Sequence, residues 1–333
     1  MSFIAKQKKT KKAVLVKTDL PNLFIKPHHD FFTANERKIT AHPVIIKPNH
    51  QEFVFGGHTY HGLCELLVYG KKLLIINVVP LEEYVSSVLR TESWPGWPLE
   101  VNKVFAITSR SYALAMMLRA QKKKKPYHIK NTNVNQTYQG LHTCDTIKTA
   151  VAQTRGMFLM YDKQPIVAMF DCCCGGLVPA LLDGVDFVAA PYLARTYACH
   201  HCRECKIYQW KAAFEEDVLD AIFATKFPKL GKIRTITITK RDKAGAVREV
   251  VVTGNMRTAI TLSGQQFGAL FKEIKSAHFE VTKARDRKTM IEGRGYGHHV
   301  GLCQWGAREM VRDGWGYKRI LQFYYPGTSF TVV

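Results

Sequence analysis

The proline at position 80 divides the first third of this 333-residue chain into two stretches of different composition. Before it, runs of β-branched and aromatic residues close to glycine or proline predict β-strands; these are VIIKP (44–48), EFVFGG (52–57) and LLIINVV (73–79). After it, apolar residues recur at helical spacing and predict a helix over residues 81–91, and a second helix is predicted from Leu99 to Ala120. We therefore expect mixed strands and helices, an α+β fold.

The remaining chain alternates between the two patterns. Residues 145–155 have a helical pattern, and two short runs at 158–162 and 166–170 predict a strand pair. Residues 199–291 differ in composition: they predict a short helix near 209–224, a hairpin around Ala244-Gly245 and a helix at 264–275 capped by Ser263. We interpret 199–291 as a smaller appended α+β lobe.

The formal net charge is +21, which favours a polyanionic partner such as nucleic acid, anionic lipid or an acidic glycan. The lysines of residues 1–20 and the run Lys122–Lys125 are interpreted as a solvated tail and a solvated loop. The sequence contains no zinc-finger spacing, no aromatic RNA-binding segment and no basic region followed by heptads. We therefore expect no nucleic-acid partner.

The sequence has no apolar run near the roughly 20 residues that span a bilayer. The N-terminus is basic, but AVLV (13–16) is shorter than the apolar core of a signal peptide. An export signal is therefore not evident in the sequence.

Three long segments, in the same order along the chain, resemble the SpoIID/LytB (stage II sporulation protein D) family. The first is PLEEYVSSVLRTESWPGWPLE (80–100) followed by AITSRSYAL (106–114), and the second is FDCCCGG (170–176). The third is GRGYGHHVGLCQWGAREMVRDGW (293–315), closing with ILQFYYPGT (320–328). The resemblance covers residues 44 to 330. Together with the composition, it leads us to expect a basic N-terminal tail at 1–20, a catalytic domain in two parts (21–198 and 292–333) and the appended lobe between them.

The resemblance implies an enzyme of the cell envelope, a lytic transglycosylase acting on peptidoglycan glycan strands that have lost their stem peptides. It implies Glu92 as the catalytic carboxyl group. A single carboxyl group suffices, because it first protonates the glycosidic oxygen and then accepts the proton of the muramyl C6 hydroxyl. Apolar neighbours would keep Glu92 protonated until it reacts. The alternative is a surface carboxylate at a helix end, and Glu82, Glu83 and Glu100 are interpreted as solvated helix residues.

Further candidate substrate-binding residues lie in the same segments. Trp94 and Trp97 would stack on sugar rings or pack in the core. Arg110 would contact a lactyl carboxylate or form a structural ion pair, and Tyr112 lies beside it. The remaining positions that match the family pattern are Gln136, Tyr138, Arg294, His298 and Gln304.

His298 would hydrogen-bond substrate, orient Glu92 or be a core histidine, and His299 replaces a family glycine. We expect a deep cleft lined by the Glu92 turn, the 136–138 loop, the 172–176 turn and the 293–304 loop.

Nine cysteines leave the metal question open. The segment YHIKNTNVNQTYQG (127–140) lacks the Cys and His residues that many family members carry there, so no zinc site is expected at that place. In CHHCREC (199–205), two residues lie between Cys199 and Cys202 and two between Cys202 and Cys205. A fourth ligand is available from Cys172, Cys173 or Cys174. A structural zinc site, disulfides or free thiols all fit this pattern, and an iron–sulfur site fits it less well because a fourth Cys at the usual spacing is missing. No cofactor is expected for catalysis.

Two other functions compete with the enzyme. The resemblance also implies a peptidoglycan-binding protein that stimulates a cell-wall amidase. A nucleic-acid binder would show tight, salt-dependent binding to duplexes. The biological setting, sporulation or cell division, is left open by the sequence.

Overall fold

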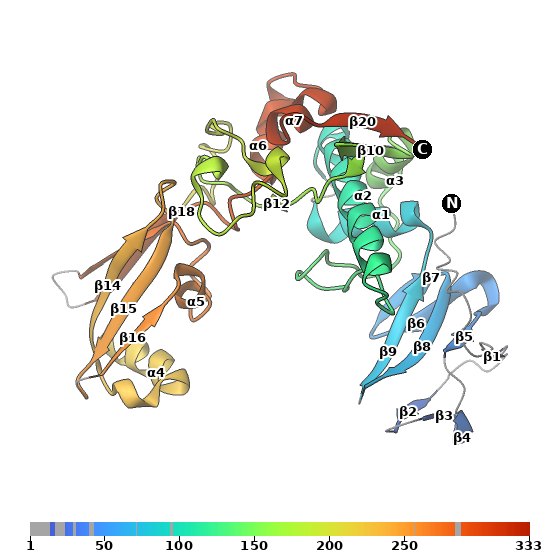
Figure 1. Ribbon diagram of the computed structural model, residues 1–333, viewed down its shortest axis with the longest axis horizontal. Helices are drawn as coiled ribbons and strands as arrows, with labels where there is room; N and C mark the ends of the chain where they lie inside the picture. The colour runs from blue at the N-terminus through green and yellow to red at the C-terminus, as the bar shows by residue number, and fades with distance from the viewer. Residues whose placement is uncertain are drawn as a thin grey trace. The chain divides into compact units, whose positions relative to one another are not determined.

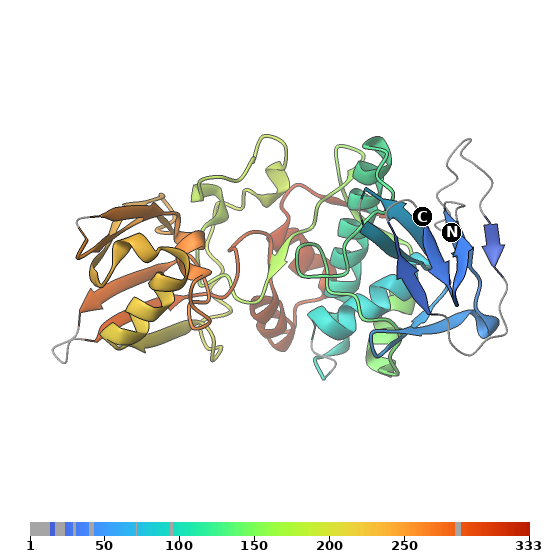
Figure 2. The same ribbon diagram turned by 90° about the horizontal axis from the view of Figure 1, so that it is seen from below.

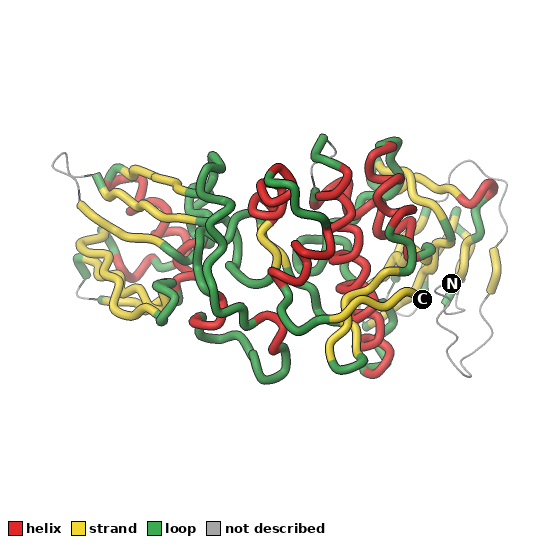
Figure 3. The backbone as a smooth tube through the Cα atoms, turned by 90° about the horizontal axis from the view of Figure 1, so that it is seen from above, coloured by secondary structure: helices red, strands yellow, loops and turns green. Residues whose placement is uncertain are grey.

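The computed structural model in Figure 1 places most of the chain. It describes residues 14–16, 24–28, 31–39, 43–70, 72–93, 96–256, 258–283 and 288–333. The chain forms two compact units, one of residues 1–157 with Val332 and Val333, the other of residues 158–331. Both units contain helices and strands, as Figure 3 shows by colour, which confirms the α+β class. The division falls inside the predicted first part of the catalytic domain.

The first unit combines small sheets with a group of helices. Its main sheet has the strand order β1-β5-β8-β9, β2-β3-β4 form a second sheet, and β6-β7 form a hairpin. The strands are β1 (Val14–Val16), β2 (Ile25–Pro27), β3 (Phe32–Ala34), β4 (Arg37–Ile39), β5 (Val44–Ile46), β6 (Glu52–Phe55), β7 (His58–His61), β8 (Leu63–Tyr69) and β9 (Lys72–Val78). The helices are the 3-10 turn η1 (Asn49–Gln51), α1 (Leu81–Glu92), α2 (Leu99–Lys122) and α3 (Asp145–Gln153).

Helix α2 is the centre of the first unit. Because α1 and α3 both pack on it, side chains from Val101 to Ala115 are buried around most of its circumference. The burial is not limited to one apolar face of α2, because small residues of the other faces, Ala106 and Ser109 among them, are buried as well.

The second unit begins with loop-rich chain and closes with short helices. Strand β10 (Met157–Tyr161) pairs with β11 (Gln164–Pro165) and β20 (Ser329–Val332), and β12 (Phe170–Asp171) pairs in parallel with β19 (Leu302–Cys303). The predicted partner of β10 at 166–170 was wrong, because β10 pairs with β11 at 164–165 and only Phe170 of the predicted strand lies in a strand, β12. The 3-10 turns are η2 (Pro179–Leu181) and η3 (Pro191–Leu193), and the last helices are α6 (Gln304–Arg312) and α7 (Tyr317–Tyr324).

Residues 209–294 enclose a core of their own. Strands β14 (Ile233–Arg241), β15 (Val247–Gly254) and β16 (Ala259–Leu262) lie side by side, with α4 (Glu216–Lys226) and α5 (Gly264–Gly268) against them (Figure 1 and Figure 2). Strands β13 (Gln209–Phe214), β17 (Phe279–Lys283) and β18 (Thr289–Arg294) form a second sheet, and η4 (Pro228–Leu230) follows α4. Phenylalanines dominate the core; they are Phe214, Phe223, Phe267, Phe271 and Phe279.

Two predictions in this region need correction. Residues 209–214 form strand β13 and no helix, because Ala212 and Phe214 point inward in alternation while the backbone pairs with β18. Helix α5 is shorter than predicted, although Ser263 does cap it: Ser263 Oγ accepts from the Gln266 N–H at 3.1 Å, and Gln266 Oε1 accepts from Ser263 N–H at 2.8 Å. The predicted hairpin around Ala244-Gly245 is confirmed as β14 and β15.

Among the described helices, none has both the length and the apolar character needed to cross a bilayer.

Candidate functional site

Glu92 is the last residue of α1, where the chain leaves the helix. The helix stops because Ser93 takes an extended conformation (φ −116°, ψ 173°). The Glu92 side chain is half-buried, and its Oε1 accepts a hydrogen bond from the backbone N–H of Thr137 at 2.6 Å. This bond holds the carboxyl group against a loop that is 45 residues further along the chain.

The 135–138 loop is attached to the helices at several points. Thr91 Oγ1 donates to the carbonyl oxygen of Thr137 at 2.5 Å, so Thr137 is held through both its N–H and its C=O. The amide of Asn135 donates to the Tyr112 hydroxyl at 2.9 Å. These contacts bring the predicted residue Tyr112 and the loop carrying Gln136 and Tyr138 to the same end of α1 as Glu92.

Gln136 and Tyr138 are buried beside Tyr84, a residue that the sequence analysis missed. The Tyr84 hydroxyl donates to Gln136 Oε1 at 3.1 Å, and the rings of Tyr84 and Tyr138 stack with centroids 5.3 Å apart. The Tyr138 hydroxyl donates to Asn77 Oδ1 at 2.5 Å. Gln136 Nε2 is buried and has no partner among the described residues. The helical spacing of Tyr84 and Val88 was the available signal for Tyr84.

The tyrosines remain protonated donors in this environment. Burial raises the pKa of Tyr84 well above its ordinary value, and the neighbouring Tyr112, Tyr138 and Glu92 raise this pKa further. Burial likewise raises the pKa of Tyr138, with Tyr60 and Glu83 adding to the effect. The arrangement can therefore supply one carboxyl group and neutral hydrogen-bond donors, which suits a proton transfer to a neutral substrate oxygen.

Trp97 lies half-buried beyond the end of α1, with its ring centroid 6.3 Å from that of the buried Phe105. It therefore packs on the core with one side and is partly exposed, so both predicted roles remain compatible with its position. Trp94 lies outside the described residues.

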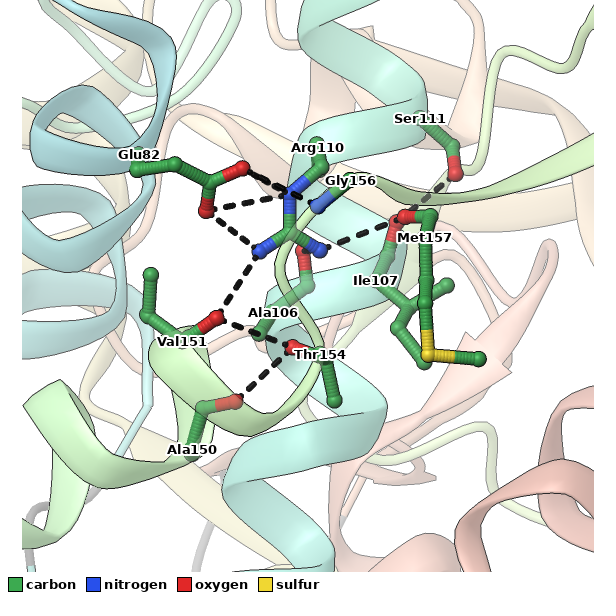
Figure 4. Close-up of polar contacts among 10 residues, drawn as sticks. All are labelled: Glu82, Ala106, Ile107, Arg110, Ser111, Ala150, Val151, Thr154, Gly156 and Met157. Atoms are coloured by element: carbon green, nitrogen blue, oxygen red, sulfur yellow. Dashed lines mark hydrogen bonds and ion pairs between the residues drawn. The ribbon is translucent and has the colours of Figure 1, made fainter. Parts of the chain in front are cut away.

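Arg110 is enclosed in the protein (Figure 4). Its side chain is fully buried, and Glu82 accepts from Arg110 Nη2 at 2.7 Å and from Nε at 3.0 Å. Its remaining N–H groups face backbone carbonyls, which belong to Ala106, Val151 and Met157. The ion pair with Glu82 and the backbone carbonyls occupy the Arg110 guanidinium, which supports the structural ion pair over contact with a lactyl carboxylate. Glu82 is correspondingly no solvated helix residue, contrary to the prediction.

A pocket of about 410 Å³ lies in the first unit near the start of α1. Its lining includes the polar residues Glu83 and Ser86. Each of them contacts a histidine that also lines the pocket: His61 Nδ1 pairs with Glu83, and His142 Nε2 lies 3.0 Å from Ser86 Oγ. Glu92 does not line it, and nine residues of helix at about 1.5 Å each separate Glu83 from Glu92. The pocket is therefore distinct from the Glu92 site.

In the second unit, two of the motif segments pack on each other. Cys173 N–H donates to Tyr296 O at 3.1 Å, and Tyr296 N–H donates to Cys173 O at 2.7 Å. Asp171 Oδ2 accepts from the His299 N–H at 2.6 Å. His299 takes a left-handed φ of 65°, a conformation that glycine adopts without strain, which fits a position where the family usually has glycine. Burial lowers the pKa of His299 to about 4, so its ring is neutral near neutral pH.

The predicted residues of the C-terminal loop have different surroundings. His298 is exposed, and its Nδ1 accepts from the Val300 N–H at 3.1 Å. Arg294 ends β18, with Nη2 at 3.4 Å from His278 Nε2. Gln304 is buried as the first residue of α6. Arg294 thus lies in β18, His298 in the loop that follows it, and Gln304 in α6.

The cysteines group differently from the prediction. Cys199 and Cys202 lie with Cys174 and Cys303, and the four sulfur atoms are within 4.8 Å of one another. Cys205 Sγ instead lies 3.6 Å from Cys173 Sγ. The spacing of the CHHCREC segment indicated two members of the set, and pairing of β12 with β19 supplies Cys303.

Comparison with known proteins gave two family matches and several relatives. A family model described as SpoIID, stage II sporulation protein, matches residues 69–161, and one described as a domain of unknown function matches residues 193–301. An uncharacterised protein of Brachyspira hyodysenteriae is 31% identical over 290 residues, 86% of this chain and 76% of the relative. Stage II sporulation protein D of Bacillus subtilis is 27% identical over 77% of this chain and 76% of its own length.

A third relative carries a different name. The protein named amidase enhancer in Bacillus subtilis is 24% identical over 74% of this chain, and the match covers 40% of that protein. The first family match contains Glu92, Tyr112, Gln136 and Tyr138, the residues that the structure brings together in the first unit.

Proposed function

Since the chain belongs to the SpoIID (stage II sporulation protein D) family, we propose that it is a lytic transglycosylase that cleaves peptidoglycan glycan strands, with Glu92 as acid and base. The observation that carries the proposal is the position of the Glu92 carboxyl group, held by Thr137 beside Tyr84 and the buried Gln136. We place the protein in the cell envelope, where its substrate is found.

The proposed reaction needs one carboxyl group and no activated water. Protonated Glu92 gives its proton to the oxygen between muramic acid and glucosamine as the glycosidic bond breaks. The resulting carboxylate accepts the proton of the muramyl C6 hydroxyl, whose oxygen bonds to C1 and closes a 1,6-anhydro ring. Atoms and protons balance, and Glu92 ends in its starting state. A hydrolase would instead need a second carboxylate to activate water.

The surroundings of Glu92 support this role. The Thr137 N–H limits the motion of the carboxyl group, and this loop is itself held by Thr91 and Asn135. A group fixed in this way loses little freedom on reaching the transition state. The net charge of +21 favours a glycan with lactyl carboxylates.

The test is incubation of the whole chain with glycan strands stripped of peptides, followed by mass spectrometry. Products lighter by one water than hydrolysis products are expected from the wild type. Glu92→Gln should lower the rate by about 100-fold or more. Glu100→Gln is the matched control, because Glu100 lies in the next helix and pairs with Lys103 at 2.7 Å. Unchanged cleavage by Glu92→Gln would refute the assignment.

A second function is supported by the relative named amidase enhancer. In that case the chain would bind peptidoglycan and stimulate a cell-wall amidase without cleaving glycan. The same variants separate the two functions: the binding function predicts no anhydro product from the wild type and full amidase stimulation by Glu92→Gln. Loss of both activities in Glu92→Gln, with folding intact, would favour a shared site.

A further inference from the structure

Four buried cysteines from separate parts of the second unit converge on one point. Cys174 follows β12, Cys199 and Cys202 belong to the CHHCREC segment, and Cys303 ends β19. All four side chains are at most 1% exposed, and their sulfur atoms lie within 4.8 Å of one another. We propose that Cys174, Cys199, Cys202 and Cys303 bind one structural zinc ion in a tetrahedral site of four thiolates.

The sulfur spacing fits a single ion. Sulfur atoms about 2.3 Å from a zinc ion at the corners of a tetrahedron lie about 3.8 Å apart. The Sγ atoms of Cys174 and Cys202 are 3.7 Å apart. This distance is too long for a disulfide, whose sulfur atoms are separated by about 2.05 Å. An iron–sulfur cluster places its thiolates on different iron atoms, so it separates the sulfur atoms more widely than one ion does.

Backbone hydrogen-bond donors point at the sulfur atom of Cys303, which is fully buried. Cys303 Sγ accepts from the Cys174 N–H and from the Gly306 N–H, each at 3.3 Å. The second of these donors belongs to the first turn of α6, where the helix dipole favours a thiolate. The Tyr324 hydroxyl lies 3.1 Å from Cys199 Sγ. Such outer contacts orient and stabilise metal-bound thiolates.

Two neighbouring residues fit a charged centre. Zinc with four thiolates carries a net negative charge, and the buried Arg195 lies against the ring of Tyr324, 5.7 Å from its centroid. The charge of Arg195 also reaches the buried carboxyl group of Asp171, whose pKa it lowers, so a negative metal centre would be a second partner for this cation. Gly306 leaves room for the site, because an added Cβ would lie 2.8 Å from Cys199 Sγ.

The ion would fasten three chain segments at one point. The turn after β12, the CHHCREC segment and the start of α6 would share one anchor, and the loop with His298 and His299 leads into the last of them. His299 Nδ1 donates to the carbonyl oxygen of Cys174, next to the proposed ion. Zinc would therefore fix the shape of the loop that carries His298 and connects Arg294 in β18 to Gln304 in α6.

The test measures metal content and cobalt spectra of the full chain. The wild type should hold about one zinc ion and no iron, and replacement by Co²⁺ should give the intense visible bands of a tetrahedral thiolate site. Cys303→Ser and Cys202→Ser should lower zinc retention against a chelator by about tenfold or more. Cys205→Ser is the matched control, because it lies in the same CHHCREC segment but outside the set, and it should retain zinc.

Three results would overturn the proposal: a wild type without metal after reconstitution with zinc, iron in place of zinc, or zinc that Cys205→Ser loses and Cys303→Ser keeps. If a variant fails to fold, the wild type can be stripped of metal by a chelator and reloaded with Co²⁺. Its visible bands then test for the tetrahedral thiolate site without any substitution. The readout is independent of glycan cleavage.

Discussion

Replacing Glu82 should destabilise the first unit far more than replacing its neighbour Glu83. Glu82 accepts from the Arg110 guanidinium at 2.7 Å and 3.0 Å, and the Arg110 side chain is fully buried. In Glu82→Ala, the remaining acceptors are backbone carbonyls at 3.2 Å to 3.4 Å, which leave a buried charge without a counterion. Breaking one partner of a buried pair costs about 3–5 kcal/mol.

The magnitude for the conservative variant follows from the same contacts. Glu82→Gln keeps the volume and one acceptor oxygen but removes the charge, so we expect a loss of about 2–3 kcal/mol. Glu83→Gln removes a partly exposed partner of His61, and an ion pair near the surface contributes no more than about 1 kcal/mol. The double variant Glu82→Gln/Arg110→Met no longer has a buried charge at this position and should be more stable than Glu82→Gln alone.

Hydrogen exchange followed by mass spectrometry of the α2 peptides measures the free energy of opening of this unit. Equal protection of α2 in Glu82→Gln and Glu83→Gln would refute the reasoning, because Arg110 would then not depend on its ion pair. A substrate-binding Arg110 would instead raise KM in Arg110→Met and leave the protection of α2 unchanged.

Three further predictions concern other parts of the chain. Gly301→Ala should weaken the pairing of β12 with β19, because φ of Gly301 is 78° and an added Cβ would overlap the Met169 carbonyl. Hydrogen exchange of the β19 amides should therefore become faster, and an unchanged exchange rate would contradict this prediction. Phe267→Ala should cost the lobe about 3–5 kcal/mol in denaturant unfolding, since the ring is fully buried, and a loss below about 1 kcal/mol would contradict the packing. Burial lowers the pKa of His142, and its Nδ1 accepts from the Cys144 N–H, so protonation is disfavoured in the folded state. Neutral His142 contributes its full stability above pH 6.5, which is about the pKa of histidine in the unfolded chain. This contribution is lost as the pH falls from there through the lower pKa of the folded state. In His142→Gln, hydrogen exchange of the α3 amides should depend less on pH over this range.

Elements with a strong local pattern could be predicted from the sequence. The helix after Pro80 and the hairpin of β14 and β15 follow from spacing and turn residues alone. Strand β13 was taken for a helix, because the alternation in QWKAAF is short and its partner, β18, lies about eighty residues later in the chain. Short segments take the structure that their partners impose, and partners distant in sequence leave no local signal.

The candidate site shows the same division. Glu92, Gln136 and Tyr138 could be selected from motifs, and the structure joins them through Thr137, which no motif marked. Arg110 and Glu82 are 28 residues apart on two helices, so no sequence spacing predicted that they pair. Sequence patterns indicate which chemical groups are available, whereas contacts decide which of them remain accessible.

The order of residues along the chain was enough to predict the α+β class and the family, and to select the carboxyl group on which the proposed chemistry depends. The folded arrangement was needed to show that Arg110 is held in a buried ion pair and that Cys303, rather than Cys205, joins Cys199 and Cys202. The physical reason is that periodicity and capping act over a few residues, while burial and sulfur convergence depend on chain segments brought together by folding. No sequence spacing could have indicated that Cys174 and Cys303 belong to the four-cysteine group, because the pairing of β12 with β19 brings them together.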